Sequence, residues 1–163
     1  MLSLAKWAKV RVTTFKGDFF VNFEEKVESF KALVAERNMT FKESETDTHV
    51  TFLTRETTKS GAQPVMIIAF NKKTTDAELY AATVTHVPDY VEDLPILNAL
   101  NEFNQEFKYF RCVLDSDRDV TLASTLDLDL GFSPEIILQH SFMMFQAADE
   151  VNEYMQKLYT QVQ

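Results

Sequence analysis

The feature that most constrains the fold is a series of three strand-like segments joined by links too short for a crossover. Residues 49–54, 65–71 and 78–85 are rich in apolar and β-branched side chains, and the links between them are polar. Parallel strands need a dozen or more connecting residues, so these links favour antiparallel hairpins. The segment 65–71 is apolar on both faces, which predicts a central position in the sheet.

Another strand pair and three helices complete the pattern. Residues 109–114 and 120–130 flank an acidic turn, and the second segment alternates between apolar and polar side chains. Helices are expected to begin after Asn22, Asp93 and Ser133, because these residue types cap helix N-termini. The element order is therefore α-β-β-β-α-β-β-α. It predicts an α+β fold in which helices pack on an antiparallel sheet of about five strands.

Two of the helices carry more detailed signals. Asn22 and Glu25 match a capping box, and the first helix should end near Asn38. Residues 43–47 after it read as a solvated acidic loop or the edge of a strand. The apolar residues of the second helix recur at helical spacing and are expected to face the core: Leu94, Leu97, Leu100 and Phe103.

The distribution of charge predicts a boundary at residue 21. The chain has a net charge of −9, but the basic residues Lys6, Lys9, Arg11 and Lys16 all precede the first acidic residue. We therefore expect residues 1–21 to form an N-terminal extension and residues 22–163 to form one domain.

Three hypotheses compete for this extension. Residues 1–16 could be a basic arm that touches a membrane surface, or residues 10–15 could add a strand. In the third hypothesis the extension is not translated in the cell. Residues 16–18 are the peptide that a ribosome-binding sequence would encode if read in frame, and Val21 follows at the distance of a start codon.

The residue content argues against catalysis and against cofactors. The chain has 3 glycines, none close to another, so it lacks glycine-rich phosphate-binding loops. Its one cysteine, Cys112, excludes an internal disulfide and is expected to be a buried structural thiol. The acidic turn 115–119 lacks the glycine and glutamate of a calcium loop. We therefore predict no enzyme activity and no catalytic, cofactor-binding or metal-binding residues.

Charge and hydropathy also limit the partners and the compartment. The acidic chain repels phosphate backbones, so nucleic acid is not an expected partner. The longest apolar run, residues 65–70, is too short to cross a bilayer, and the first residues do not resemble a secretory signal. The sequence therefore predicts a cytoplasmic protein.

The first half of the last helix is apolar on nearly all sides, and one sheet face cannot cover it all. The predicted partner or dimer surface consists of Ile136, Phe142, Met143, Met144 and Phe145. The competing interpretation is that these residues only fill the core. Asn101 and Asn104 on the second helix are candidate polar contacts to a strand end or to a partner's backbone, with ordinary surface polarity as the alternative.

The second half of the chain resembles the YbjN family of bacterial proteins. The resemblance lies in residues 97–104, in Tyr109, in the turn 115–119, in the alternating strand 122–130 and in residues 131–135, which open the last helix. It implies a fold similar to the type III secretion chaperones, usually as a dimer. Members of the family are described as sensory transduction regulators, and the similar chaperones bind extended protein segments and catalyse nothing.

These observations predict a non-enzymatic protein-binding module, chaperone-like or regulatory, that forms a homodimer. The alternative is a binding protein for a small apolar ligand, or a small enzyme, that uses a sheet face lined by Phe52, Phe70 and Phe110.

Overall fold

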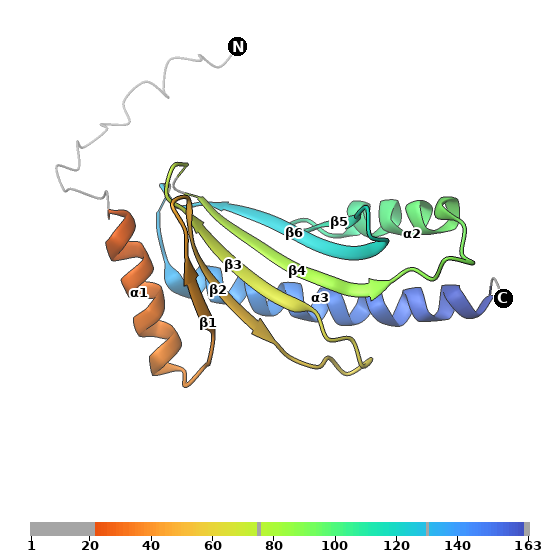
Figure 1. Cartoon of the computed structure of the whole chain (residues 1–163), viewed down its shortest axis with the longest axis horizontal. Coiled ribbons are helices and arrows are strands. Elements are labelled where there is room, and N and C mark those ends of the chain that lie inside the picture. The colour runs from red at the N-terminus through yellow and green to blue at the C-terminus, as the bar shows by residue number, and fades with distance from the viewer. Residues whose placement is uncertain (1–21, 75, 130, 162–163) are drawn as a thin grey trace, which may run out of the picture.

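The computed structural model describes residues 22–74, 76–129 and 131–161 (Figure 1). The hypotheses for residues 1–21 therefore concern residues outside this description. The elements in chain order are α1 (Phe23–Glu36), β1 (Lys42–Glu45), β2 (His49–Arg55), β3 (Val65–Asn71), β4 (Asp76–His86), α2 (Asp93–Glu106), β5 (Arg111–Leu114), β6 (Asp119–Asp127) and α3 (Pro134–Gln161). Within the described ranges, no helix combines the length and the apolar character needed to span a membrane.

The strands form one antiparallel sheet of six strands in the order β1-β2-β3-β4-β6-β5. This confirms the predicted α+β fold, with β3 inside the sheet as expected. The strand beyond the expected "about five" is β1, whose four residues are all exposed. It lacks the apolar alternation of a half-buried strand, and its charged side chains suit the edge of a sheet.

Helices α1 and α3 cover one face of the sheet. Alternate strand residues on this face are buried: Val50, Phe52, Met66, Ile68, Phe70, Leu79, Ala81 and Leu122. Phe30 of α1 and Met144 of α3 pack in the same core, and both are 0% exposed. In Figure 1, α3 passes behind the strands, and α1 and α2 lie at opposite ends of the molecule.

The start of α1 confirms the predicted capping box. The Asn22 side chain accepts a hydrogen bond from the Glu25 amide at 2.8 Å, and the Asn22 amide donates to the Glu25 carboxylate at 3.3 Å. The helix ends at Glu36, close to the expected position. One turn from its start, the buried Lys26 pairs with Asp129 at 3.0 Å. This ion pair fixes the beginning of α1 beside the chain that leaves β6.

One expectation for α2 was wrong, and the other holds only for Leu100 and Phe103, which are buried as predicted. Asp93 is the first residue of the helix rather than its cap, and the N-cap, Glu92, makes no side-chain cap hydrogen bond. The Asp93 carboxylate is instead bound by Arg118, which takes it away from the helix amides. Leu94 and Leu97 are 66% and 51% exposed. The face that enters the core consists of Ile96, Ala99, Leu100 and Phe103.

Candidate functional site

The apolar side chains in the first half of α3 point in several directions and do not form one continuous surface. Ile136 is 47% exposed and Phe142 is 52% exposed, whereas Met143 and Phe145 are partly buried. Met144 is 0% exposed and belongs to the core, so it cannot contribute to a partner surface as the sequence suggested. The candidate surface on α3 therefore excludes Met144.

Phe142 and Phe145 line an apolar groove between α3 and the segment that follows α1. The groove has a volume of about 60 Å³. Seven of its wall residues are apolar: Met39, Phe41, Met66, Ile68, Leu138, Phe142 and Phe145. Sequence reasoning missed Met39 and Phe41, although two large apolar residues in an otherwise polar link were the available signal.

Ile136 and Met143 lie on the other flank of α3 together with His140. Residues three or four apart share a helix face, and this face is about half a turn away from Leu138 and Phe142. The His140 ring is 5.3 Å from the Tyr109 ring, and its Nδ1 is buried with no hydrogen-bond partner in the described structure. Burial lowers the pKa of His140, so this flank carries a neutral ring among aromatic neighbours.

The two candidate asparagines of α2 differ in their surroundings. Asn104 binds both backbone groups of one residue in the edge strand β5: its side chain accepts from the Cys112 amide at 2.7 Å and donates to the Cys112 carbonyl at 3.0 Å. It therefore holds α2 against a strand of its own chain. The Asn101 side chain is exposed and makes no hydrogen bond to any described residue.

The structure does not form the predicted phenylalanine-lined cup. Phe52 and Phe70 are 3% and 0% exposed, and the Phe30 ring of α1 lies 5.1 and 5.4 Å from theirs. Phe110 lies elsewhere, with its ring 6.3 Å from the Phe107 ring, beside the edge strand β5. The first two phenylalanines therefore fill the core, and the third belongs to a different surface.

Phe110 contributes to a larger hollow of about 710 Å³ at the edge of the sheet. β5 pairs only with residues 120–123 of β6, so β6 continues beyond its neighbour. Ser124 and Thr125 line the hollow together with Phe107 and Tyr109. It is an open strand edge beside an aromatic loop, and no sequence signal pointed to it.

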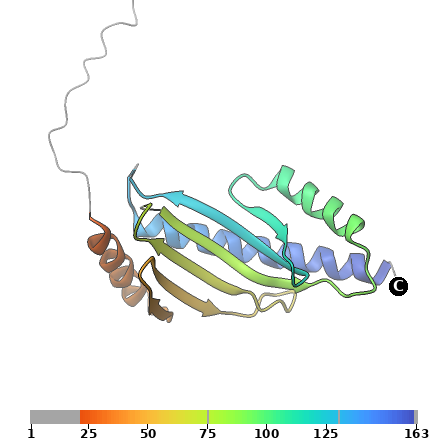
Figure 2. The ribbon, with the colours of Figure 1, turned by 45° about the horizontal axis from the view of Figure 1, so that its top comes forward.

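The second face of the sheet is uncovered: among the described elements, no helix lies over it (Figures 1 and 2). The centre of this face is apolar and partly exposed, and we call it the open face. Its central residues are Leu53, Val65, Ile67, Tyr80, Ala82 and Ala123. The sequence predicted that β3 is apolar on both faces, but the described helices cover only one of them.

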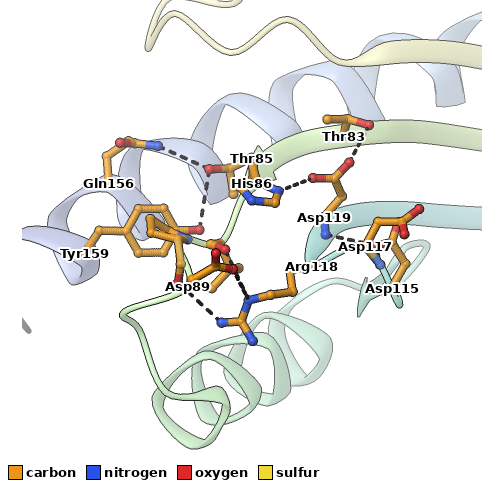
Figure 3. A network of polar contacts seen from close by, with 12 residues as sticks. Thr83, Thr85, His86, Asp89, Asp115, Asp117, Arg118, Asp119, Gln156 and Tyr159 are labelled. Carbon is orange, nitrogen blue, oxygen red and sulfur yellow. Dashed lines mark hydrogen bonds and ion pairs between the residues drawn. The ribbon is translucent and has the colours of Figure 1, made fainter.

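Polar side chains gather where α2, the turn before β6 and the end of β4 meet (Figure 3). Arg118 has a positive φ of 62°, which turns its side chain toward the loop between β4 and α2. Its guanidinium donates to the Val91 carbonyl at 2.7 Å and to the Val87 carbonyl at 3.3 Å, and it pairs with Asp93. Arg118 therefore holds the loop that leads into α2.

The neighbouring part of the network joins β4 to β6 and to α3. Asp119 accepts hydrogen bonds from Thr83 at 3.1 Å and from His86 Nδ1 at 2.9 Å. Thr85 accepts from Gln156 of α3 at 3.1 Å. The polar groups of β4, β6 and α3 therefore bind one another. None of them is a nucleophile or a base that is directed into a cavity. The network stabilises the fold at the end of the sheet.

The remaining candidate groups are also accounted for by structure. Burial raises the pKa of the Cys112 thiol to about 12, so the thiol is unreactive at neutral pH. The Asp115 carboxylate accepts hydrogen bonds from the amides of Asp117 and Asp119, both at 2.9 Å, which closes the acidic turn on itself. No cluster of three potential ligands for a metal ion occurs among the described residues. Among the described residues, the groove beside α3 and the centre of the open face are apolar surfaces that remain partly exposed.

Comparisons with known proteins add no assignment. No protein-family model matches the chain, and no curated protein matches it significantly.

Proposed function

We propose that this chain is a non-enzymatic protein-binding module, chaperone-like or regulatory, that holds an apolar side chain of a partner in the groove beside α3. The observation that carries the proposal is the position of Phe142, which is 52% exposed although it borders a groove of apolar residues. Large apolar side chains that surround a surface hollow are typical of the anchoring points of protein interfaces.

The size of the groove favours a protein partner over a small ligand. Pockets for small ligands typically measure about 300–1,000 Å³. The groove measures about 60 Å³, which suits part of one side chain, and it is flanked by exposed helix surface on which the rest of a partner segment can lie. The resemblance to the YbjN family and a cytoplasmic location remain predictions of the sequence, and both are compatible with this role.

The test is a photo-crosslinking amino acid at position 142 in the native host. We expect it to capture one specific protein, whereas the same label at the exposed Glu153, farther along α3, should not. Phe142→Glu should abolish copurification of that protein, and Thr160→Glu, at the exposed far end of the same helix, should not. Capture that is equal at both positions, or a partner that survives Phe142→Glu, would contradict the proposal.

A binding protein for a small apolar ligand is the second candidate. The hollow of about 710 Å³ at the β6 edge supports it, because this volume lies within the range of ligand pockets and Phe107 and Phe110 line it. Native mass spectrometry of the full chain would show a copurifying compound that is lost in Phe110→Ser. If the chain carries no bound compound when it is purified from its host, the ligand-binding candidate is excluded and the protein-binding role remains.

A further inference from the structure

The strand β6 has an unpaired edge beyond the start of β5. The ladder between the two strands covers residues 120–123 of β6, and β6 itself continues to Asp127 (Figure 2). On its other side, β6 pairs with β4 along the whole of residues 124–127. One side of this stretch is therefore bound within the sheet, and no described strand lies beside the other.

The contacts of Asn104 show which backbone groups point outward at this edge. Its side chain binds both the amide and the carbonyl of Cys112, so these two groups point away from β6. Hydrogen-bonded pairs alternate with non-bonded pairs in an antiparallel ladder, so the next pair, Arg111 with Ala123, is the hydrogen-bonded one. Two residues farther along β6, the N–H and the C=O of Thr125 point to the same side. Within the described ranges, no hydrogen bond occupies them.

The unpaired edge borders the hollow of about 710 Å³, which is basic at one end. Lys108 and Arg111 line this end, and their side chains make no hydrogen bond and no ion pair within the described ranges. The chain as a whole has a net charge of −9, so the two cations contrast with the rest of it. The other end of the edge is acidic, because Asp127 lies there opposite Asp76 of β4.

We propose that this edge binds the C-terminal end of a partner polypeptide as an additional short strand. An N–H and a C=O on one edge residue are complementary to one residue of an extended peptide, which exchanges both hydrogen bonds with it. The last residue of the partner donates its N–H to the Thr125 carbonyl, and its carboxylate accepts from the Thr125 amide. Lys108 and Arg111 supply the positive charge that a carboxylate favours.

The direction of the strands brings the carboxylate to the basic end. β5 runs antiparallel to β6, so a peptide that extends the line of β5 runs from Asp127 toward Thr125. Its last residue is then the one nearest to Arg111, at the start of β5. The residue two positions before the last lies opposite Asp127 and shares a face with it, so a basic side chain suits this position.

This site is separate from the groove beside α3 and takes a different part of a partner, a chain end with its carboxylate. It also differs from a site for an apolar compound in the same hollow. An apolar compound offers no partner to the Thr125 backbone or to the two cations, whereas a peptide carboxylate binds both.

A peptide library measured against the full chain tests the inference. The probes are hexapeptides with randomised last four residues, made once with a free C-terminus and once with an amidated one. Peptides enriched by the wild type should carry a basic residue two positions before the last. Amidation should weaken their binding about tenfold or more in fluorescence anisotropy, because it removes the charge that the two cations bind.

Charge reversal tests where the carboxylate lies. Lys108→Glu combined with Arg111→Glu should weaken the enriched peptides about tenfold or more. Lys42→Glu is the matched control, because Lys42 is exposed on the opposite edge strand, β1, and makes no ion pair within the described ranges. It should bind the peptides like the wild type, and so should Phe142→Glu, so a failure of the groove proposal leaves this one intact. Circular dichroism checks that each variant is folded.

Hydrogen exchange tests the backbone contact without any substitution. The Thr125 amide should exchange rapidly in the free chain and slowly in the peptide complex. The Ser124 amide, which points to β4, should be protected in both.

Four results would overturn the inference. They are a library without a binding member, amidated peptides that bind equally well, a charge-reversed chain that binds like the wild type, and a Thr125 amide that the peptide does not protect. A hollow that holds an apolar compound in native mass spectrometry but binds no peptide would also overturn it, and would support the second candidate function.

Discussion

Single residues in this chain show that burial determines the role of a side chain where the sequence alone allows more than one role. Lys26 occupies a helical position between apolar neighbours, and its side chain is 5% exposed because Asp129 receives its charge at 3.0 Å. The sequence indicated only that Asp129 belongs to the alternating segment 120–130, and nothing in it joined Asp129 to a residue more than a hundred positions away. Long-range pairs of this kind depend on the fold and are not visible in local patterns.

Cys112 is the residue whose chemistry changes most on folding. Its pKa rises from 9.0 to about 12 through burial alone, so the native thiol keeps its proton where the unfolded thiol loses it. The unfolded state binds fewer protons between these values, so this group lowers the stability of the fold as pH rises from 9 toward 12 and has no such effect below 9.

We therefore predict that Ellman's reagent reacts with native Cys112 only as fast as the chain opens. The reaction should be complete within the mixing time in denaturant, and the native rate should fall when the fold is stabilised. A thiol that reacts at the same rate in native and unfolded chain would show that Cys112 is accessible and that the burial argument is wrong.

The elements show where the sequence was informative and where it was ambiguous. The capped helix α1, the strands β2 and β3 and the start of α3 carry strong local signals, and the structure confirms them. The sequence around β1 fits a loop and a strand edge equally well, because its four exposed residues carry no apolar pattern. In α2 two overlapping sets of apolar residues both fit helical spacing, and only tertiary packing selects the set that contains Ile96 over the set that contains Leu94.

This choice between faces gives a prediction for α2. Ile96→Ala removes a side chain that is 0% exposed and should lower the free energy of unfolding by about 2–5 kcal/mol. Leu97→Ala, the neighbouring position at 51% exposure, should change it by about 0.5 kcal/mol or less. Urea unfolding followed by circular dichroism measures both. Equal losses, or a larger loss for Leu97→Ala, would mean that the helix presents the other face to the core.

At the scale of the whole molecule, the sequence indicated that apolar surface exceeds what one chain can cover. It placed this excess apolar surface on α3. Four of the five residues predicted for that surface are at least partly exposed, whereas Met144 is buried. It could not locate the open face, because a strand that is apolar on both sides predicts burial without saying whether the same chain provides the cover. The groove beside α3 and the open face are therefore consequences of how the layers stack.

The layered structure also predicts that the two surfaces act independently. The groove lies on the α3 side of the sheet and the open face on the other, with the buried core between them. Substitutions at separated sites without shared partners usually add within about 0.3–0.5 kcal/mol, which is about a factor of two in a binding constant. Arg55→Asp, on the open face, should therefore leave copurification of the partner and crosslinking through position 142 unchanged. If Arg55→Asp reduced crosslinking, the partner would have to contact both sides of the sheet, and the groove alone would not account for its binding.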